Sequence, residues 1–231
     1  FCTYCIVPYV RGRERSRKAE DILAEIRGMC EAGYREVVLT GIHISSYGID
    51  FEEDAWREGK SVEALKSEGR HDYSGRSKLI DLIELIHEIP GLSRIRIGSF
   101  EPRIVTEEFC KRLAALPKVC PHFHLSLQSG CDTVLKRMNR RYDVDEFYTG
   151  VELLRKYYDR PAITTDVIVG FPQETEAEFQ ETCAFLNKVN FFEMHIFKYS
   201  KRKGTKAAVM AGQVSEEIKT KRSAVLQEIE V

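Results

Sequence analysis

The order of the predicted elements constrains the fold of this chain more than any other feature of its sequence. Five short, mostly apolar segments have the character of buried strands, and they span residues 36–41, 94–99, 122–127, 162–169 and 192–197. Each of them but the last is followed promptly by a segment with helical character. This alternation of strands and helices predicts an α/β protein with a parallel sheet and right-handed crossovers.

Seven helices complete the alternation, at residues 18–32, 79–89, 106–116, 132–138, 144–157, 175–189 and 215–230. Gly33 stands where a glycine commonly ends a helix, Thr106 is an N-cap residue, and Thr175 with Glu178 predicts a capping box. The loop before the first helix would follow one further strand. Six strand–helix units suit an open, partial (βα)6 TIM-like barrel with its first strand truncated, and a doubly wound sheet is the competing architecture.

Residues 50–77 interrupt the alternation. This segment is rich in charge, contains three glycines and has few apolar residues. Its composition cannot bury enough apolar area to offset the ~1–2 kcal/mol per residue that ordering costs. We therefore predict a dispensable surface insertion, which Trp56, the single tryptophan, would pin to the body of the domain.

Composition and charge narrow the class of protein. No apolar run approaches the ~18 residues of a membrane span, and a net charge of −1 gives no global field that would attract nucleic acid. Seven cysteines, scattered after the first pair, argue against a disulfide framework and for a reducing compartment. We expect a cytoplasmic protein with no membrane partner.

Cys2 and Cys5 form a Cys-x-x-Cys pair in the first loop. Thiolates at this spacing can bind one metal centre from a single tight turn. The spacing alone does not separate a redox pair, half a zinc site and half an iron–sulfur site.

Polar and small residues follow the predicted strands at the ends where ligands bind in parallel α/β architectures. Small residues let a ligand approach the backbone, and carboxylate or amide side chains can hold hydroxyl and amino groups. The candidates at these ends are Thr40, Gly41, His43, Ser99, Glu101, Gln128 and Asp166.

Several of these side chains have a structural alternative. Glu101 could cap its own loop, and Gln128 could satisfy loop backbone groups. Asp166 interrupts an apolar strand, where an unpaired carboxylate is costly to bury, so we expect an arginine, a lysine or water as its partner. His122 and His124 share one face of a strand and would suggest a metal pair, but the sequence offers no third ligand.

Two basic segments stand near these candidates. Residues 11–18 hold five basic residues in eight, which suits either a solvated helix entrance or the binding of a carboxylate or phosphate. Residues 198–205 add further positive charge after the last strand. Tyr199 lies among these lysines, so we expect nucleic-acid contact there, with bases stacking on its ring.

Six segments in this order resemble the radical S-adenosylmethionine methylthiotransferases. They are FCTYCIVPYVRGRERSR, VVLTGIHISSYG, IRIGSFEP, HLSLQSGCDTVLKRMNRRY, ITTDVIVGFPQETEAEF and HIFKYSKRKGTKAA. Residues 41–43 and 138–142 are similar to the branch that methylthiolates N6-threonylcarbamoyladenosine in tRNA. Branches acting on isopentenyladenosine or on a ribosomal protein are the alternatives within the family. A zinc-stabilised RNA-binding module is the alternative from another class, although two cysteines cannot complete a zinc tetrahedron.

The resemblance implies a tRNA-modifying transferase whose barrel uses a [4Fe–4S] cluster and S-adenosyl-L-methionine. In this family the reductive cleavage of S-adenosyl-L-methionine gives a radical that abstracts hydrogen from C2 of the adenosine. A second [4Fe–4S] cluster in an N-terminal domain, a C-terminal RNA-binding domain, and an electron donor such as flavodoxin or ferredoxin are also implied. We expect residues 1–206 to be the catalytic domain and residues 207–231 to be a helix leading towards the RNA-binding domain.

The resemblance also assigns roles by motif position. Cys2 and Cys5 match the second and third cysteines of a Cys-x-x-x-Cys-x-x-Cys cluster loop, whose first cysteine would stand four residues before Cys2. The implied cofactor contacts are the Tyr4 backbone with the adenine, Thr40 and Gly41 with the methionine amino group, and Ser99, Glu101, Gln128 and Asp166 around the cofactor or substrate. With two thiolates, these 231 residues alone should not hold a stable cluster, and the first dozen residues should be loosely held.

Overall fold

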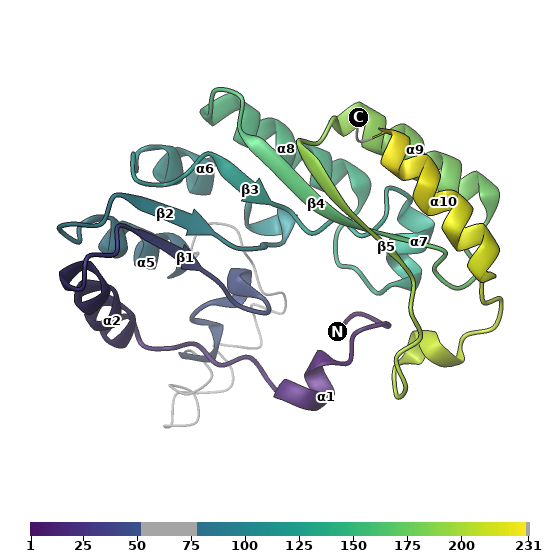
Figure 1. Cartoon of the computed structure of the whole chain (residues 1–231), viewed down its shortest axis with the longest axis horizontal. Coiled ribbons are helices and arrows are strands. Elements are labelled where there is room, and N and C mark those ends of the chain that lie inside the picture. Colours follow the sequence, from purple (N-terminus) through teal and green to yellow (C-terminus); the bar gives the residue numbers. More distant parts are fainter. Residues whose placement is uncertain (52–77, 230–231) are drawn as a thin grey trace, which may run out of the picture. The chain divides into compact units, whose positions relative to one another are not determined.

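The computed structural model describes residues 1–51 and 78–229, so the predicted insertion lies outside the described residues from residue 52 onward. The strands are β1 (Glu36–Leu39), β2 (Arg94–Ile97), β3 (His122–His124), β4 (Ala162–Val169) and β5 (Glu193–Lys198). The helices are α1 (Val7–Arg11), α2 (Ala19–Glu31), α5 (Lys78–His87), α6 (Glu107–Ala114), α7 (Asp132–Arg137), α8 (Val144–Tyr157), α9 (Glu176–Val189) and α10 (Glu216–Ile229). Short 3-10 helices are η1 (Ile44–Ser46), η2 (Pro102–Ile104) and η3 (Lys206–Val209). Their order along the chain confirms the predicted α/β class (Figure 1).

The helix ends follow the local chemistry that predicted them. The Thr106 hydroxyl accepts a hydrogen bond from the Phe109 amide at 3.2 Å, as an N-cap should. Thr175 and Glu178 form the reciprocal capping box at the start of α9. Gly33 has φ +98° just after α2, a conformation that favours glycine. No helix among the described residues is long and apolar enough to cross a membrane.

The strands pair in parallel, in a sheet of β1 and β2 and a sheet of order β3-β4-β5. β1, β2 and β3 end two or three residues earlier than predicted. The Gly98 amide donates to the Leu39 carbonyl at 2.7 Å, and a Cβ on Gly98 would lie 3.0 Å from that oxygen. Beyond the end of β3, Gln128 has φ +76° and still pairs with β4 in an isolated parallel bridge to Val167. Strand propensity could not show these tertiary contacts.

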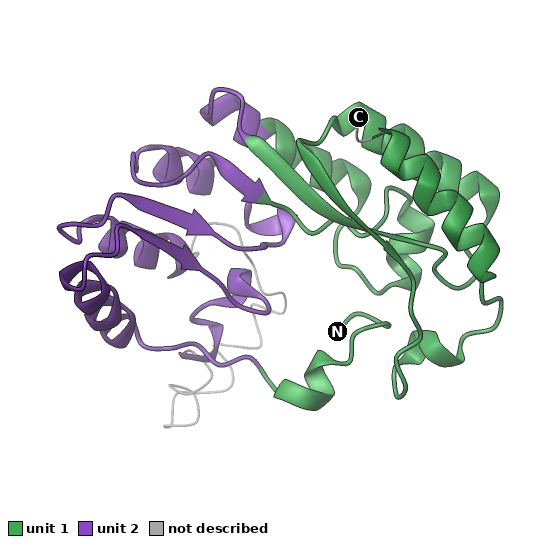
Figure 2. Cartoon of the chain, in the orientation of Figure 1, with its two compact units in different colours: residues 1–13, 124–152, 162–231 green, residues 14–123, 153–161 purple. Residues whose placement is uncertain are grey.

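The described chain divides into two compact units, shown in Figure 2. Unit 2 comprises residues 14–123 and 153–161, and unit 1 comprises residues 1–13, 124–152 and 162–231. The core of unit 2 contains one whole apolar face of α5 and an aromatic group in which Phe100 meets Phe109 and Phe123 edge to face. Burial of these large side chains is the main source of stability for the unit.

In unit 1, β4 alternates between a buried face and a more open one. Ile163, Thr165, Val167 and Val169 are at most 1% exposed, whereas Asp166 on the other face is half-buried. In the register with β5, Asp166 stands opposite His195, which is exposed. The period of two therefore gives the sheet one core face and one face with polar side chains.

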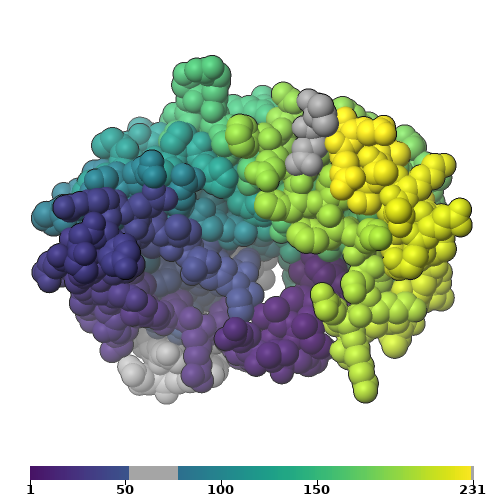
Figure 3. All heavy atoms as spheres, viewed as in Figure 1, coloured from purple at the N-terminus to yellow at the C-terminus, as the bar shows by residue number. Residues whose placement is uncertain are grey.

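Helix α10, yellow in Figures 1 and 3, is held to the rest of unit 1 by a buried ion pair. The Arg222 guanidinium donates to the Glu174 carboxylate at 2.7 Å and to the Glu174 carbonyl at 3.1 Å. The same carboxylate accepts from the Gly170 amide at 2.9 Å. Burial raises the pKa of Glu174 even though Gly170 and Arg222 oppose this change. The loop that follows β4 is thus tied directly to α10.

Replacing Arg222 tests this attachment. Arg222→Met should lower the free energy of unfolding by about 3–5 kcal/mol, because it leaves the buried Glu174 carboxylate without its cation. Urea denaturation measures the loss, and Lys221→Met, an exposed position on the same helix, is the matched control. Adding Glu174→Gln to Arg222→Met should restore part of the stability. A single variant as stable as the control would contradict the ion pair's structural role.

Candidate active site

The predicted site residues lie in both units. Unit 1 contains Cys2, Tyr4, Cys5, Gln128 and Asp166, and unit 2 contains Thr40, Gly41, Ser99 and Glu101.

Cys2 and Cys5 lie on one tight turn, in which the Cys5 amide donates to the Cys2 carbonyl at 3.2 Å. Both thiols are half-buried and neither forms a disulfide. Two soft sulfur ligands on one turn fit an iron–sulfur cluster as two of its protein ligands. Among the described residues, no group of three or more histidine, cysteine or acidic side chains could hold a metal ion. The turn therefore supplies a pair of thiolates and no third ligand beside them.

The segment of residues 137–142 holds the cysteine turn in place. The Thr3 amide donates to the Met138 carbonyl at 3.0 Å, and the Thr3 hydroxyl donates to the Arg137 carbonyl at 2.9 Å. The Asn139 side chain donates to the Phe1 carbonyl at 2.7 Å. On the other side, the Ala207 amide donates to the Thr3 carbonyl at 2.9 Å. These hydrogen bonds attach residues 1–3 to the rest of unit 1, and the mobility expected of the first dozen residues remains a prediction.

Arg140 connects the same segment to the Cys2 sulfur. Its Nη1 donates to Cys2 Sγ at 3.1 Å, its Nε donates to the Tyr142 hydroxyl at 2.8 Å, and its Nη2 donates to the Ser126 carbonyl at 3.2 Å. Although burial opposes it, Tyr142, Tyr4 and Cys2 raise the pKa of Arg140, so the guanidinium remains charged. The sequence analysis did not identify Arg140 as a site residue. It used residues 138–142 only as a segment that resembles one branch of the family, and no local pattern indicates that Arg140 contacts Cys2.

Tyr4 turns its ring into a hydrophobic cluster. The ring meets Phe171 edge to face at a centroid distance of 6.2 Å, and Phe171 meets Tyr199 in the same way at 5.4 Å. Burial, and after it the neighbouring Cys2, raises the pKa of Tyr4. The adenine contact implied for the Tyr4 backbone does not involve the ring, and it remains a prediction.

The prediction that bases stack on Tyr199 is wrong. Its side chain is 4% exposed and packs inside this cluster. The basic residues around it remain at the surface, since Lys201, Arg202 and Lys203 are all exposed. In this segment the aromatic residue anchors the chain and the cations face solvent.

Asp166 finds its partner on the open face of the β3-β4-β5 sheet. His124 Nε2 lies 3.4 Å from Asp166 Oδ2, and His124 Nδ1 lies 2.9 Å from the Thr164 hydroxyl. The His195 ring meets the His124 ring edge to face at 5.5 Å. The partner of Asp166 is thus a histidine on the neighbouring strand, where we expected an arginine, a lysine or water. Both edges of the His124 ring are engaged by β4 side chains.

Gln128 is fixed through its backbone. Its amide donates to the Asp166 carbonyl at 2.8 Å, and its carbonyl accepts from the Ile168 amide at 2.9 Å. Its left-handed conformation and these two bonds hold it against β4. The role of its side chain toward a ligand remains a prediction.

In unit 2, Glu101 is buried and already engaged by two basic side chains. Arg103 donates to its carboxylate at 2.8 Å, and His43 Nε2 lies 3.6 Å from the same oxygen. Its backbone amide donates to the Ser45 hydroxyl at 2.9 Å. Burial alone would raise the pKa of Glu101, but the contacts from His43 and Arg103 outweigh burial and lower the pKa to about 2. The carboxylate therefore remains ionised at neutral pH.

Thr40, Gly41 and Ser99 are exposed at the ends of β1 and β2. A Cβ added to Gly41 would meet only the Ile44 backbone and side chain, at 3.8–3.9 Å, which is ordinary contact. The fold itself therefore does not demand a glycine at this position. An open strand end without a side chain is suited to the approach of a ligand.

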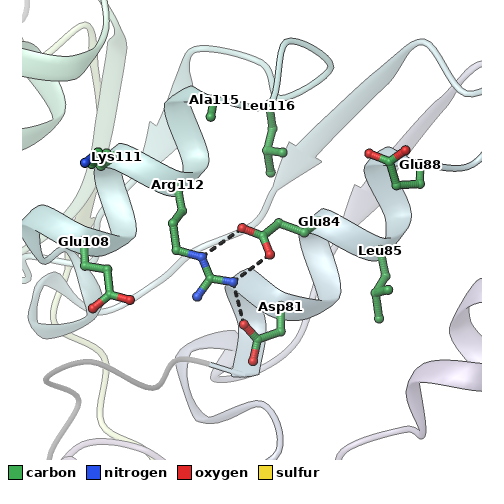
Figure 4. Close-up of a pocket in the computed structure, with 9 residues that line it drawn as sticks. All are labelled: Asp81, Glu84, Leu85, Glu88, Glu108, Lys111, Arg112, Ala115 and Leu116. Atoms are coloured by element: carbon green, nitrogen blue, oxygen red, sulfur yellow. Dashed lines mark hydrogen bonds and ion pairs between the residues drawn. The ribbon is translucent and has the colours of Figure 1, made fainter.

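A surface hollow lies between α5 and α6 in unit 2. In Figure 4, Arg112 reaches across it to Glu84 and Asp81, with N–O distances of 2.6–2.8 Å. Leu85 and Leu116 contribute apolar walls. None of the predicted site residues lines this hollow.

Comparison with known proteins gives one family match and several named relatives. Residues 1–186 match the family described as the Radical SAM superfamily. The tRNA-2-methylthio-N(6)-dimethylallyladenosine synthase of Carboxydothermus hydrogenoformans is 41% identical over 230 residues, which are 100% of this chain and 47% of that protein. The threonylcarbamoyladenosine tRNA methylthiotransferase MtaB of Bacillus subtilis is 42% identical over 96% of this chain and 44% of that protein. The protein of the same name from Chlamydia pneumoniae is 40% identical over 99% and 48%. The chain thus spans about half the length of the curated relatives it matches.

Solved structures agree on the fold. The radical S-adenosylmethionine methyltransferase TsrM of Kitasatospora setae has a TM-score of 0.60 and 14% identity, over 90% of this chain and 36% of that chain. SuiB of Streptococcus suis, in its structure bound to S-adenosylmethionine, has a TM-score of 0.58 and 12% identity, over 99% and 44%. At these identities the likeness concerns the fold alone, and it confirms an α/β fold of the radical SAM type.

The low pKa of Glu101 predicts a pH-dependent contribution to stability. Because the folded-state pKa lies below the usual value of 4.5, the ionised group stabilises the folded state above about pH 5. This contribution, about 2–4 kcal/mol, is lost as the pH falls from about 4.5 towards 2. Glu101→Gln should therefore lower the free energy of unfolding at neutral pH and by progressively less in acid.

Urea titrations of both proteins from about pH 3 to about pH 7 measure this difference. Glu108→Gln is the control, because Glu108 is exposed on α6, and it should change little at any pH. A Glu101→Gln difference that stays constant with pH would contradict the assigned contacts.

Proposed function

This chain belongs to the radical SAM superfamily, and from that premise we propose that it is the catalytic domain of a methylthiotransferase that modifies tRNA. The observation that carries the proposal is identity of about 40% along the whole chain to relatives named for 2-methylthio modification of tRNA adenosines. The turn that presents Cys2 and Cys5 supports it, since it provides two of the sulfur ligands that such an enzyme requires.

For the nucleoside, we propose N6-threonylcarbamoyladenosine. Residues 41–43 and 138–142 are the segments that resemble this branch. The second candidate is the dimethylallyl (isopentenyl) derivative, because relatives of both names are similar to the chain at nearly equal identity. A zinc-stabilised RNA-binding module fits less well, because no third or fourth zinc ligand joins the cysteine pair among the described residues.

Cys2 and Cys5 would hold two irons of a [4Fe–4S] cluster, with a third cysteine from outside these residues. Such a cluster, when bound, supplies the electron that cleaves S-adenosyl-L-methionine to a carbon radical. Within unit 1, Asp166, Gln128 and the Tyr4 backbone are proposed to orient cofactor or substrate. Within unit 2, Thr40, Gly41, Ser99 and Glu101 are proposed to bind polar groups of the cofactor, for which the exposed strand end at Gly41 leaves room.

The turn of residues 201–204 is proposed to contact the tRNA backbone. Lys201, Arg202 and Lys203 are exposed, and none of them pairs with a carboxylate among the described residues. Thr205 stiffens the turn, because its amide and its hydroxyl both donate to the Arg202 carbonyl, at 3.1 and 2.8 Å. Unpaired cations on a rigid turn suit phosphate binding, whose affinity decreases with salt.

The proposed function also carries a proposal for the barrel and for the domain bounds. We propose an open (βα)6 barrel in which a strand preceding residue 1 completes the five described strands. Residues 1–206 would form the catalytic domain and residues 207–231 a helix towards an RNA-binding domain. A second cluster domain and a flavodoxin- or ferredoxin-like electron donor would complete the enzyme.

The nucleoside profile of tRNA from cells that lack the protein tests the proposal. Loss of the 2-methylthio group from threonylcarbamoyladenosine alone is expected, and loss from the dimethylallyl derivative would assign the second candidate. An unchanged profile would contradict both. Iron and sulfide of about four each per barrel cluster in the reconstituted full-length protein would support the cofactor, whereas zinc without sulfide would overturn it.

A substitution at Asp166 separates a binding role from a structural one. Asp166→Asn should leave the melting midpoint nearly unchanged, because asparagine keeps the shape and can still accept from His124. In the full-length enzyme it should weaken cofactor or substrate binding by about 1.5–3 kcal/mol, the scale of a hydrogen bond to a charged group. Asp159→Asn, at a position with a 92% exposed side chain, is the control. A much lower melting midpoint with normal binding would show that Asp166 is structural.

A further inference from the structure

Arg140 is built into unit 1 as a fixed cation beside the Cys2 sulfur. Three of its nitrogens have separate acceptors, namely Cys2 Sγ at 3.1 Å, the Tyr142 hydroxyl at 2.8 Å and the Ser126 carbonyl at 3.2 Å. The guanidinium carbon also lies 4.8 Å from the centroid of the Tyr142 ring. This many contacts leave the side chain little freedom to follow a substrate or to leave the sulfur.

Tyr142 is itself held, so the cation has a rigid support. Its side chain is 5% exposed, and its hydroxyl donates to the Leu127 carbonyl at 2.8 Å and contacts the Ser126 carbonyl. Both carbonyls lie in the segment that follows β3. This segment thus provides the acceptors that fix Tyr142 and, through it, Arg140.

The cysteine turn is fixed to the same segment through its backbone. The Thr3 amide bonds to the Met138 carbonyl at 3.0 Å, and the Asn139 side chain bonds to the Phe1 carbonyl at 2.7 Å. Turn and cation therefore have one common support, residues 137–142. The distance from guanidinium to sulfur is set by this support and does not depend on a bound ligand.

We propose that Arg140 is a positioning residue that orients the Cys2 thiolate and raises the reduction potential of an iron–sulfur cluster bound to it. The inference rests on the proposed function, because it needs a cluster on Cys2. A cluster becomes more negative when it accepts an electron, so a nearby cation and a hydrogen bond to a ligand sulfur favour the reduced state. Arg140 provides both at one atom.

An arginine suits this role better than a lysine. Its planar guanidinium can direct separate N–H groups to a sulfur, a hydroxyl and a carbonyl at once, and its charge persists at all accessible pH values. A lysine ammonium would keep the charge but could not donate to these three acceptors in the same planar arrangement. Comparing arginine with lysine at position 140 therefore separates the effect of charge from the effect of orientation.

The test is a potentiometric titration of the barrel cluster, followed by electron paramagnetic resonance, in the reconstituted full-length protein. Arg140→Met should shift the equilibrium towards the oxidised cluster about tenfold, which corresponds to a midpoint about 59 mV more negative for one electron. Arg140→Lys should show a smaller shift. Arg141→Met is the matched control, because the neighbouring Arg141 is exposed, and its midpoint should equal that of the unaltered protein.

Other results of the titration would overturn either the inference or the proposed function. An Arg140→Met protein that holds a full cluster and has the control's midpoint would overturn the inference. If Arg140→Met does not bind a cluster, Arg140→Gln, which keeps N–H donors without the charge, is titrated instead with the same expectation. Failure of the methionine, glutamine and lysine variants alike to hold a cluster would overturn the inference and mark Arg140 as a folding residue. An unaltered protein that binds no iron and sulfide would instead overturn the proposed function.

Discussion

The alternation of β4 between a core face and an open face is the constraint on which unit 1 depends. Ile163, Val167 and Val169 are buried on one side, while Asp166 stands on the other. Because side chains alternate strictly along a strand, the same eight residues build the core and place a carboxylate on the open face. His124 and His195 join Asp166 there only because the neighbouring strands share the register.

The sequence predicted the elements well wherever local chemistry decides them. Helix α8 has the predicted bounds, and the caps at Thr106 and Thr175 form as expected. The predicted segments extend two or three residues beyond the ends of β1, β2 and β3, although backbone hydrogen bonds at Gly98 and Gln128 continue the pairing. Periodicity describes burial along a segment, but it cannot show which backbone groups a distant side chain will bind.

The candidate site was predictable in position but less so in partners. The strand-end rule selected Glu101 and Asp166 correctly as polar groups that need partners. It did not predict that His124 would pair with Asp166, or that Arg140 would donate a hydrogen bond to Cys2, 138 residues away in sequence. It also assigned Tyr199 to the surface because its neighbours are charged, whereas an aromatic ring between lysines can equally well anchor the turn.

Two glutamates show how environment decides the behaviour of a buried carboxylate. The pKa of Glu101 is lowered because His43 and Arg103 outweigh its burial, whereas the pKa of Glu174 is raised because burial outweighs Gly170 and Arg222. Each carboxylate fixes a loop that follows a strand.

The hydrogen bonds that hold the cysteine turn at Thr3 limit how its sequence can change. Thr3 is held through its amide on one side, by Met138, and through its carbonyl on the other, by Ala207. Main-chain bonds of this kind do not depend on the side chain, whereas the third bond, from the Thr3 hydroxyl to the Arg137 carbonyl at 2.9 Å, requires a hydroxyl residue at position 3. A proline at position 3 would break one of these bonds, because proline lacks the amide hydrogen. An insertion between Thr3 and either cysteine would shift that cysteine relative to the bonded backbone. The turn therefore tolerates a change of side chain at position 3 better than it tolerates a change of length.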